Sequence, residues 1–291
     1  MANSQIATIR VRRLASELVR FREQKRLSIK DVAQATGVNE VTLRRIEARQ
    51  ARPQRRTLIA LLDAYSVRGD EREKIITLAR GAQEQGWIRP YDSELPDEYN
   101  AYIQFESEAS ELKSYQSLFI PGLLQTEDYA RAVITGTLPT APSSEVELRV
   151  RARMERQAIL KREKPVRLRV AVDEAALRRL VGGADVMRAQ LDHLARMSAE
   201  PHIRVQVIPF TAGAHPGMPG SFVLMNFTQS AEPEIIWVDS HVGDLFLEKP
   251  VEISRLTTAF DELSAQACSP AESLAMIATL RDRLGNVDGG G

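Results

Sequence analysis

The chain has 291 residues, 43% of them hydrophobic, which argues against global disorder and suggests about two domains with buried cores. Its formal net charge is zero, yet residues 1–90 hold 19 Lys and Arg against 10 Asp and Glu, whereas the remainder holds 20 against 29. A basic N-terminal part joined to an acidic C-terminal part points to a nucleic-acid partner for the basic one.

Cysteine usage and hydropathy bound the cellular compartment. Cys268 is the single cysteine, which excludes an intrachain disulfide and a Cys-rich zinc site and fits a reducing compartment. No apolar run approaches the ~18 residues of a membrane span. The start "MANSQIATIR" lacks the apolar stretch of a signal peptide. We therefore expect a cytoplasmic protein with no membrane partner.

Residues 10–85 read as packed helices with short turns, preceded by a disordered segment 1–9. Leu14, Leu18 and Phe21 recur by four and three, which predicts one buried face of a first helix. Ser28 opens a second helix, and Asp31 three residues later makes a variant of the capping box.

The next spacing predicts two short helices that cross steeply at a tight turn. Ala33 suits the contact because it is small, and Gly37 tolerates the positive φ of the turn. Leu43 and Ile46 would bury the inner face of the following helix. A recognition helix in the major groove needs polar and basic groups on its outer face. We expect base contacts from Asn39, Glu40, Val41 and Arg44; the alternative is an ordinary helical bundle.

Other polar side chains of this region suit the sugar-phosphate backbone, which strengthens binding without reading sequence. Each could instead belong to a solvated charged surface, and Arg45 together with Glu47 could orient the helix against its own domain. The expected backbone contacts are Ser28, Thr42, Arg45, Arg49, Arg52 and Arg55.

Residues 11–68 resemble the Cro/repressor-type helix-turn-helix family (xenobiotic-response-element regulators), chiefly through "GVNEVTLRRIEARQARP". The resemblance implies five helices, with apolar residues of the fourth and fifth buried. In that family a polar residue, often Gln, stands where this chain has Glu40. A glutamate can accept a hydrogen bond from cytosine N4, which makes Glu40 a specificity residue. Alternatively, it pairs with Arg44 within the helix. The residues expected to be buried are Leu58, Leu61, Leu62, Ile75, Leu78 and Ala79.

Residues 86–98, with Pro90 and Pro96, read as a linker. Residues 99–284 read as an α+β domain with a sheet of about four strands, followed by a disordered tail 285–291. The expected strands are "VRLRVAVD", "IRVQVIPF", "SFVLMNFT" and "EIIWVDS". Helices are expected over "ELKSYQSLFI", which ends at a turn at Pro121–Gly122, then from near Thr126, over 143–163, "EAALRRLV", "ADVMRAQLDHLARMS", 250–267 and 270–284. The charged helix 143–163 suits exposed i, i+4 pairs or a dimer contact better than a second nucleic-acid surface.

The motifs "FIPGLLQTEDYARA", "RARMERQAIL", "VDEAALRRLVGG" and "VQVIPFTAGAHPGMPGSFVLMNF" resemble a C-terminal domain of unknown function found in actinobacterial regulators of WhiJ-type, antitoxin-like architecture. The resemblance implies a transcriptional regulator that is often encoded beside a small partner protein. It implies no biochemical activity.

The C-terminal part carries no recognised catalytic pattern. The four histidines lack metal-ligand spacing, and neither a G-x-S-x-G elbow nor a phosphate-binding P-loop is present, so we expect no catalytic residue, metal or cofactor. The loop "TAGAHPGMPG" is longer than packing requires, and such loops often bind ligands. It is interpreted as the rim of a ligand or partner site with His215, Met218 and Trp237, or as a merely long hairpin connection.

The sequence therefore predicts a non-enzymatic, sequence-specific DNA-binding regulator of the repressor type, associated with the nucleoid. A homodimer would bind an inverted repeat in double-stranded DNA. The C-terminal domain would dimerise and sense a small ligand or partner protein. The alternative is an antitoxin-like protein that binds a small neighbouring-gene partner and regulates its own operon.

Overall fold

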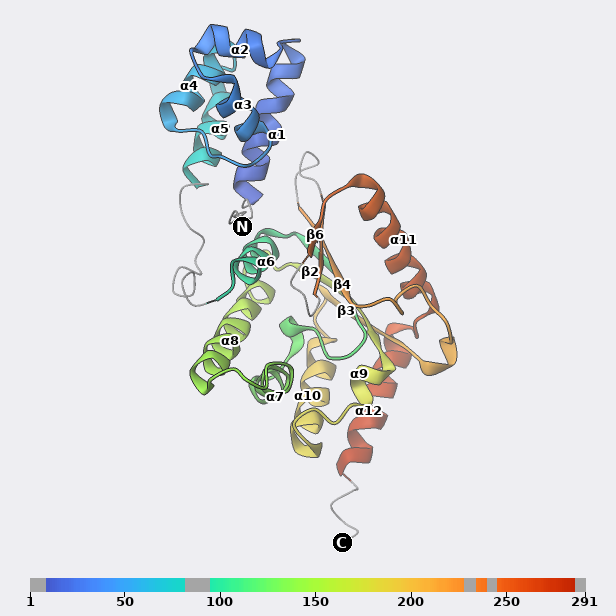
Figure 1. The fold of residues 1–291 in the computed structure, drawn as a ribbon. Helices are drawn as coiled ribbons and strands as arrows, with labels where there is room; N and C mark the ends of the chain where they lie inside the picture. Colours follow the sequence, from blue (N-terminus) through green and yellow to red (C-terminus); the bar gives the residue numbers. More distant parts are fainter. Residues whose placement is uncertain (1–8, 82–94, 228–233, 240–244, 286–291) are drawn as a thin grey trace. The chain divides into compact units, whose positions relative to one another are not determined.

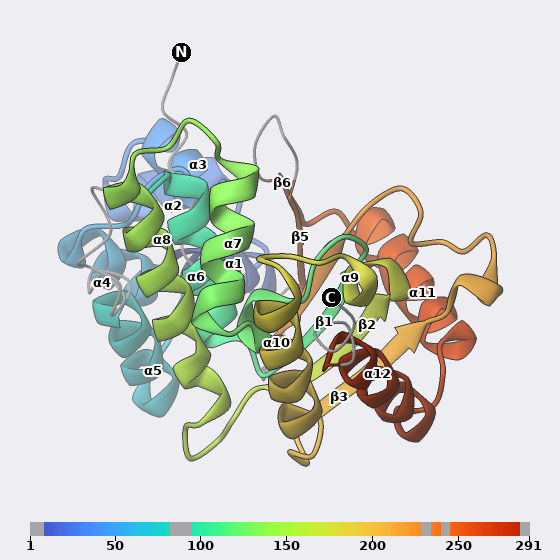
Figure 2. The ribbon, with the colours of Figure 1, turned by 90° about the horizontal axis from the view of Figure 1, so that it is seen from below.

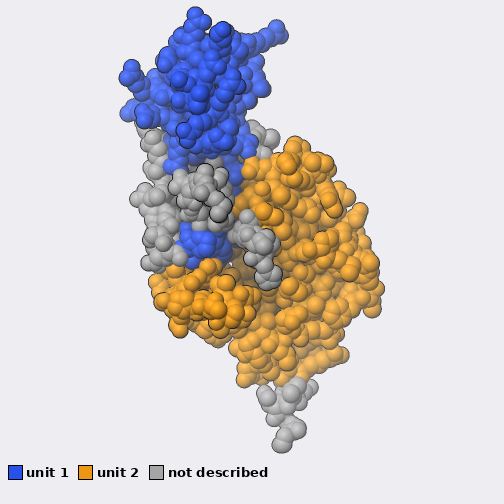
Figure 3. Space-filling model, in the orientation of Figure 1, with its two compact units in different colours: residues 1–108 blue, residues 109–291 orange. Residues whose placement is uncertain are grey.

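The structure, a computed structural model, describes residues 9–81, 95–227, 234–239 and 245–285 (Figure 1). The chain divides into two compact units, Met1–Glu108 and Ala109–Gly291 (Figure 3). Nearly all of the expected N-terminal tail 1–9, most of the expected linker 86–98 and nearly all of the tail 285–291 lie outside the described residues.

The first unit is helical, as the sequence predicts. Five helices precede residue 82, and a sixth follows in the same unit. Their bounds are α1 (Ile9–Gln24), α2 (Ile29–Thr36), α3 (Glu40–Glu47), α4 (Arg55–Ala64), α5 (Gly69–Gly81) and α6 (Asp97–Glu108). Their core contains the predicted faces of α1, α3 and α4: Leu14, Leu18, Phe21, Leu43, Ile46, Leu58, Leu61 and Leu62 are buried, and so is Ile75 of α5. Leu78 and Ala79 pack against this core while remaining partly exposed.

The start of α2 confirms the predicted capping box. The Ser28 hydroxyl accepts from the Asp31 N–H at 3.2 Å, and the Asp31 carboxylate accepts from the Ser28 N–H at 2.8 Å. A hydrogen bond that the Ser28 hydroxyl donates to the Asp31 carboxylate at 2.7 Å, together with the one from the Ser28 N–H, lowers the pKa of Asp31. At the other end of α2, Gly37 adopts the left-handed conformation with φ 70°, and its N–H donates to the Ala33 carbonyl. A glycine suits this position because an L side chain is strained there.

Three other helices of the unit end with non-glycine residues in the left-handed region. Arg26, Arg49 and Ser66 have φ values of 54°, 66° and 57° after α1, α3 and α4. In each case the next N–H donates back to a carbonyl five residues earlier, for example Val67 to Leu62 at 2.9 Å. This is the Schellman arrangement, which satisfies the last carbonyls of a helix. The three helices therefore end sharply at the expense of local backbone strain.

The second unit mixes helices and strands. In chain order it contains β1 (Glu111–Gln116), η2 (Gly122–Leu124), α7 (Glu127–Thr137), α8 (Ser143–Arg156), η3 (Gln157–Leu160), β2 (Arg167–Asp173), α9 (Glu174–Arg178), α10 (Ala184–Met197), β3 (Ile203–Ile208), η4 (Phe210–Ala212), β4 (Phe222–Asn226), β5 (Ile235–Val238), β6 (Leu245–Leu247), α11 (Pro250–Gln266) and α12 (Pro270–Gly285). The α+β class is as predicted. The helix expected from Thr126 is α7, and Thr126 is its N-cap, because its side chain accepts from the Tyr129 N–H.

The sheet has six strands in the order β3-β2-β1-β4-β5-β6, so the expectation of about four was wrong. The segment "ELKSYQ", expected to be helical, is β1, which pairs in parallel with β2 and antiparallel with β4. The strand was missed because it contains polar residues. Ser114 and Gln116 are both buried, and the Gln116 amide donates to the Ser114 hydroxyl. Pairing with a strand on each side stabilises β1, whereas its own amino-acid composition does not favour a strand. The other missed strand, β6, has only three residues.

Helices cover both faces of the sheet: α11 lies on one side, and α7 and α10 lie on the other (Figure 2). Phe260 and Leu263 of α11 pack against Tyr115, Ala171 and other residues of the sheet. The edge strand β3 is also covered, because the Cys268 N–H donates to the Val207 carbonyl and the Val207 N–H donates to the Ser273 hydroxyl. Covering an edge in this way prevents unwanted strand pairing.

Replacing Ser66 by glycine should stabilise the first unit by about 0.5–1 kcal/mol, because glycine adopts the left-handed conformation without strain. Gly37→Ala should destabilise it by about 1–2 kcal/mol through strain alone, because an added Cβ meets nothing within 4 Å. Hydrogen exchange of residues 9–81 in the full chain measures both changes. Effects of the same sign for the two substitutions would contradict this account.

Candidate nucleic-acid interface

The turn between α2 and α3 presents the N-terminal end of α3 to solvent. Asn39 is the N-cap, and its side-chain oxygen accepts from the Val41 N–H at 2.8 Å. Leu43 and Ile46 anchor the inner face in the core of the unit. Because the side-chain oxygen of Asn39 already caps the helix, the side-chain NH₂ group is the part that can still bind a base.

The four residues predicted to read bases lie together on one exposed surface of α3. Val41 is 65% exposed, which is unusual for a large apolar side chain and suits contact with a thymine methyl group. Glu40 and Arg44 also reach solvent and approach each other at 3.4 Å, one helical turn apart. An exposed pair of this kind stabilises the helix by only about 0.2–0.5 kcal/mol. Breaking it so that either side chain can bind another partner therefore costs little free energy.

The six predicted backbone contacts are placed differently from one another. Thr42, Arg45, Arg52 and Arg55 are exposed, whereas Arg49 is partly buried in the left-handed position after α3. Ser28 is exposed, but its hydroxyl already takes part in the capping box. Arg55 is the first residue of α4, whose N-cap makes no side-chain hydrogen bond. The open N–H groups at a helix start favour anions.

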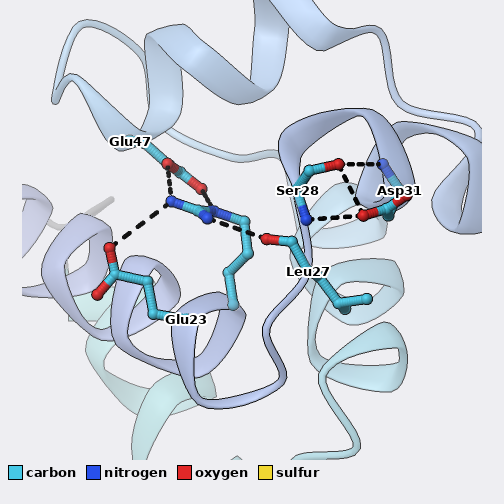
Figure 4. Close-up of polar contacts among 6 residues, drawn as sticks. Glu23, Leu27, Ser28, Asp31 and Glu47 are labelled. Carbon is cyan, nitrogen blue, oxygen red and sulfur yellow. Dashed lines mark hydrogen bonds and ion pairs between the residues drawn. The ribbon is translucent and has the colours of Figure 1, made fainter.

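A bidentate ion pair fixes α3 against α1 (Figure 4). The Arg22 guanidinium donates to both carboxylate oxygens of Glu47, at 2.6 and 3.0 Å, and to the Leu27 carbonyl at 3.0 Å. Both side chains are largely buried, with about one sixth of their surface exposed. Of the two residues expected to orient the helix, Glu47 does so, whereas Arg45 points to solvent. The Arg22 partner was missed because it lies 25 residues away in sequence.

Tyr65 lies close to this ion pair. Burial raises the pKa of its hydroxyl to about 12, and the neighbouring carboxylate of Glu47 adds to the rise while Arg22 opposes it. Tyr65 is buried and the Glu47 side chain largely so, and hydrogen bonds are stronger in such surroundings of low dielectric constant.

In the second unit, the glycine-rich loop crosses the carboxyl ends of three parallel strands; we call residues 209–221 the strap. It leaves β3 and is tied to the end of β2, where the His215 Nε2 lies 3.5 Å from the Asp173 carboxylate and the Phe210 N–H donates to Glu174. It is then tied to the end of β1, where the Ser117 N–H donates to the Ser221 hydroxyl. The strap is thus anchored at each strand that it crosses.

The structure separates the three residues predicted for this loop. His215 is turned inward: its Nδ1 accepts from the Gly217 N–H, and its ring contacts the Tyr115 ring edge-on with centroids 6.0 Å apart. Met218 points outward and is 68% exposed. Trp237 follows Ile236, which belongs to the cluster containing Tyr115, so Trp237 faces the other side of the sheet. His215 and Trp237 therefore do not converge on one site.

No group of three or more His, Cys, Asp or Glu side chains converges as a metal site among the described residues. His241, one of the four histidines, lies outside the described residues. The charged helix α8 carries the expected i, i+4 pair, Arg149 with Glu145 at 2.8 Å, and Glu147 pairs with Arg131 of α7. No described helix is long and apolar enough to span a membrane.

Two family models match the chain. The first, described as a helix-turn-helix domain, matches residues 13–75, and thus most of α1 to α5. The second, described as a domain of unknown function (DUF5753), matches residues 99–279. Searches of curated proteins and of solved structures found no match. The first match places α2 and α3 within a helix-turn-helix domain, which suggests a DNA-binding regulator.

Glu47→Gln should lower the unfolding free energy of the first unit by about 1–3 kcal/mol, because it removes the charge that Arg22 binds in a largely buried site. The matched control is Glu71→Gln, which breaks a pair with Arg20 whose side chains are 40% and 54% exposed. That change should cost at most about 0.5 kcal/mol. Hydrogen exchange of residues 9–81 compares them, and equal losses would show that the Arg22 pair has no special role.

Gly217→Ala should destabilise the second unit by about 1–3 kcal/mol, because the added Cβ would lie 2.4 Å from the Tyr115 ring and force the strap away from the sheet. Gly136→Ala in α7 is the control: its Cβ meets nothing within 4 Å, and alanine should stabilise the helix by about 0.5–1 kcal/mol. Thermal unfolding of each variant measures the difference. A Gly217→Ala protein as stable as the parent would mean that the strap is not seated on Tyr115.

Proposed function

The chain belongs to the DUF5753 family and carries a helix-turn-helix domain ahead of that region, and from this architecture we propose that it is a sequence-specific transcriptional regulator of the Cro/repressor type. It acts in the cytoplasm on the nucleoid, by binding and without catalysis. The second unit dimerises and senses a small ligand or partner protein, in a chain whose architecture resembles that of WhiJ-type regulators.

The exposed pair of Glu40 and Arg44 carries the proposal. Both side chains stand on the outer face of a helix whose inner face is buried and whose last residue, Glu47, is fixed by Arg22. Bidentate donation to guanine O6 and N7 is the commonest specific contact of arginine, and a carboxylate can accept from cytosine N4. On binding, the weak Glu40–Arg44 pair opens or tilts, and the two groups read neighbouring bases.

The surrounding residues divide the work of binding. Val41 contributes an apolar contact to a thymine methyl group, while the Asn39 amide donates to a base edge. The exposed arginines Arg45, Arg52 and Arg55 contact phosphates and set the register of the helix in the groove. The Glu40 carboxylate repels phosphate groups, so it weakens binding when α3 lies in a wrong register in the groove. It therefore increases specificity more than affinity.

A symmetric dimer would place two recognition helices one DNA turn apart. The operator is then an inverted repeat with half-sites about 34 Å apart. An antitoxin-like role, in which the second unit binds a small partner protein encoded nearby and the first regulates the operon, is compatible with this scheme. The exposed apolar side chain of Met218 on the strap favours it.

Genomic fragments selected by the full-length protein should contain one enriched inverted repeat. Glu40→Gln should shift the preferred base at one position of each half-site from cytosine toward adenine, because an amide pairs with adenine N6 and N7. Sequencing of the selected fragments for both proteins measures the shift. An unchanged preference would remove Glu40 from base reading.

On the selected site, Arg44→Ala should cost about 1–3 kcal/mol of binding free energy and relax specificity, whereas Arg52→Ala should weaken cognate and scrambled DNA alike. Titration at fixed salt concentration gives both affinities for each variant. The two arginines are comparable controls because both are exposed and neither lies in the core. Equal losses on cognate and scrambled DNA for both variants would refute the assigned roles.

A further inference from the structure

The strap edge of the second unit exposes several large apolar side chains. Eight such side chains are exposed among the described residues, and half of them, Leu118, Leu180, Phe210 and Met218, follow the ends of β1, α9 and β3 or lie in the strap. Isolated exposed hydrophobics are ordinary, whereas several at one edge mark an interaction surface. We call Phe210, Met218, Leu118 and the adjoining Arg178–Leu180 the strap surface.

The exposure of these side chains is built into an anchored backbone. The Phe210 N–H donates to the buried carboxylate of Glu174 at 2.8 Å, and the Arg178 guanidinium lies 5.8 Å from the Phe210 ring centroid. Gly217, next to Met218, packs on Tyr115, and Ser221 is bonded to Ser117. The chain therefore holds Phe210 and Met218 outward at 58% and 68% exposure while the segments beneath them are fixed.

The charge of this surface differs from that of the rest of the C-terminal part. Residues 117–120, 178–183 and 209–221 contain Arg178 and Arg179 but no Asp or Glu, in a part of the chain where acids outnumber bases. Two carboxylates beside it are engaged within the unit: Asp173 accepts from the Ala175 N–H and approaches His215, while Glu174 accepts from Arg178 and from the Phe210 N–H. The strap surface is thus apolar with a basic margin.

We propose that the strap surface docks a segment of a partner protein in which large apolar side chains stand next to carboxylates. The apolar residues would cover Phe210 and Met218, and the carboxylates would pair with Arg178 and Arg179. A second copy of the chain fits less well, because a symmetric contact would bring arginines toward arginines. A small molecule fits less well, because Phe210 and Met218 project into solvent.

This docking site deepens the sensing role in the proposed function by giving the partner's chemistry. The probe is a phage-displayed library of random 12-residue peptides, selected on the full-length protein with excess non-specific duplex DNA to occupy α3. We expect enriched peptides to place a large apolar residue within a few positions of Asp or Glu. The best peptide is then synthesised and titrated by fluorescence anisotropy.

Phe210→Ser/Met218→Ser should weaken this peptide at least tenfold, and Arg178→Gln/Arg179→Gln at least threefold with loss of salt dependence. Val251→Ser, at an exposed position of α11, is the control and should change nothing. Both serine substitutions replace exposed side chains, so thermal unfolding should confirm an intact fold. Equal peptide affinity for the parent and the Phe210→Ser/Met218→Ser variant, or failure of the library to yield a binder, would overturn the proposal.

Two further readouts separate this proposal from the proposed function. Arg44→Ala should weaken binding to the selected DNA site and leave peptide binding unchanged, while the Phe210→Ser/Met218→Ser variant should weaken peptide binding and leave DNA binding unchanged. A parent protein that binds the peptide but shows no selective DNA binding would refute the proposed regulator function and would support the docking site. Sedimentation in which a dimer is dissociated by Phe210→Ser/Met218→Ser would assign the surface to a second copy, against the proposal.

Discussion

The ion pair between Arg22 and Glu47 is the constraint on which the DNA-binding surface depends. It joins the end of α1 to the end of α3 through two hydrogen bonds, and a third from Arg22 to the Leu27 carbonyl fixes the connection to α2. Leu43 and Ile46 settle which face of α3 is buried, but apolar contacts are not directional and allow small rotations. A bidentate guanidinium–carboxylate contact is directional. It therefore sets the angle at which Glu40, Val41 and Arg44 meet a groove.

In the second unit, buried polar side chains stabilise segments of irregular backbone by hydrogen bonds to their carbonyl groups. Around η2, the Gln125 amide donates to the Ile120 carbonyl, the Gln157 amide to the Gln125 carbonyl, and the Gln190 amide to the Leu124 carbonyl. These bonds satisfy carbonyls that no helix or strand would satisfy. The strap follows the same principle, since Asp173 and Glu174 bind it from beneath. The carboxyl edge of the parallel strands, a common place for ligands, is thereby covered with a rigid segment whose apolar side chains face outward.

The sequence predicted the parts of the fold that local chemistry decides. The capping box at Ser28, the left-handed Gly37 and the buried face of α1 follow from short-range rules and are present. The strand β1 could not be found this way, because its place in the sheet comes from partners far along the chain and its buried Ser114 and Gln116 imitate a polar segment. Arg22 was missed for the same reason. His215, predicted to face a ligand, is instead directed toward Asp173 and Tyr115, contacts that only the tertiary structure brings together.

The most direct test of the central claim is the ratio of affinities for the selected operator and for scrambled DNA after the charge-free double replacement Arg22→Met/Glu47→Leu. Replacing both partners by apolar residues can leave stability nearly unchanged while removing the directional contact. If the pair sets the angle of α3, the ratio should fall at least tenfold while binding to scrambled DNA is retained. An unchanged ratio would contradict the account, because the apolar face of α3 would then be enough to position its reading surface.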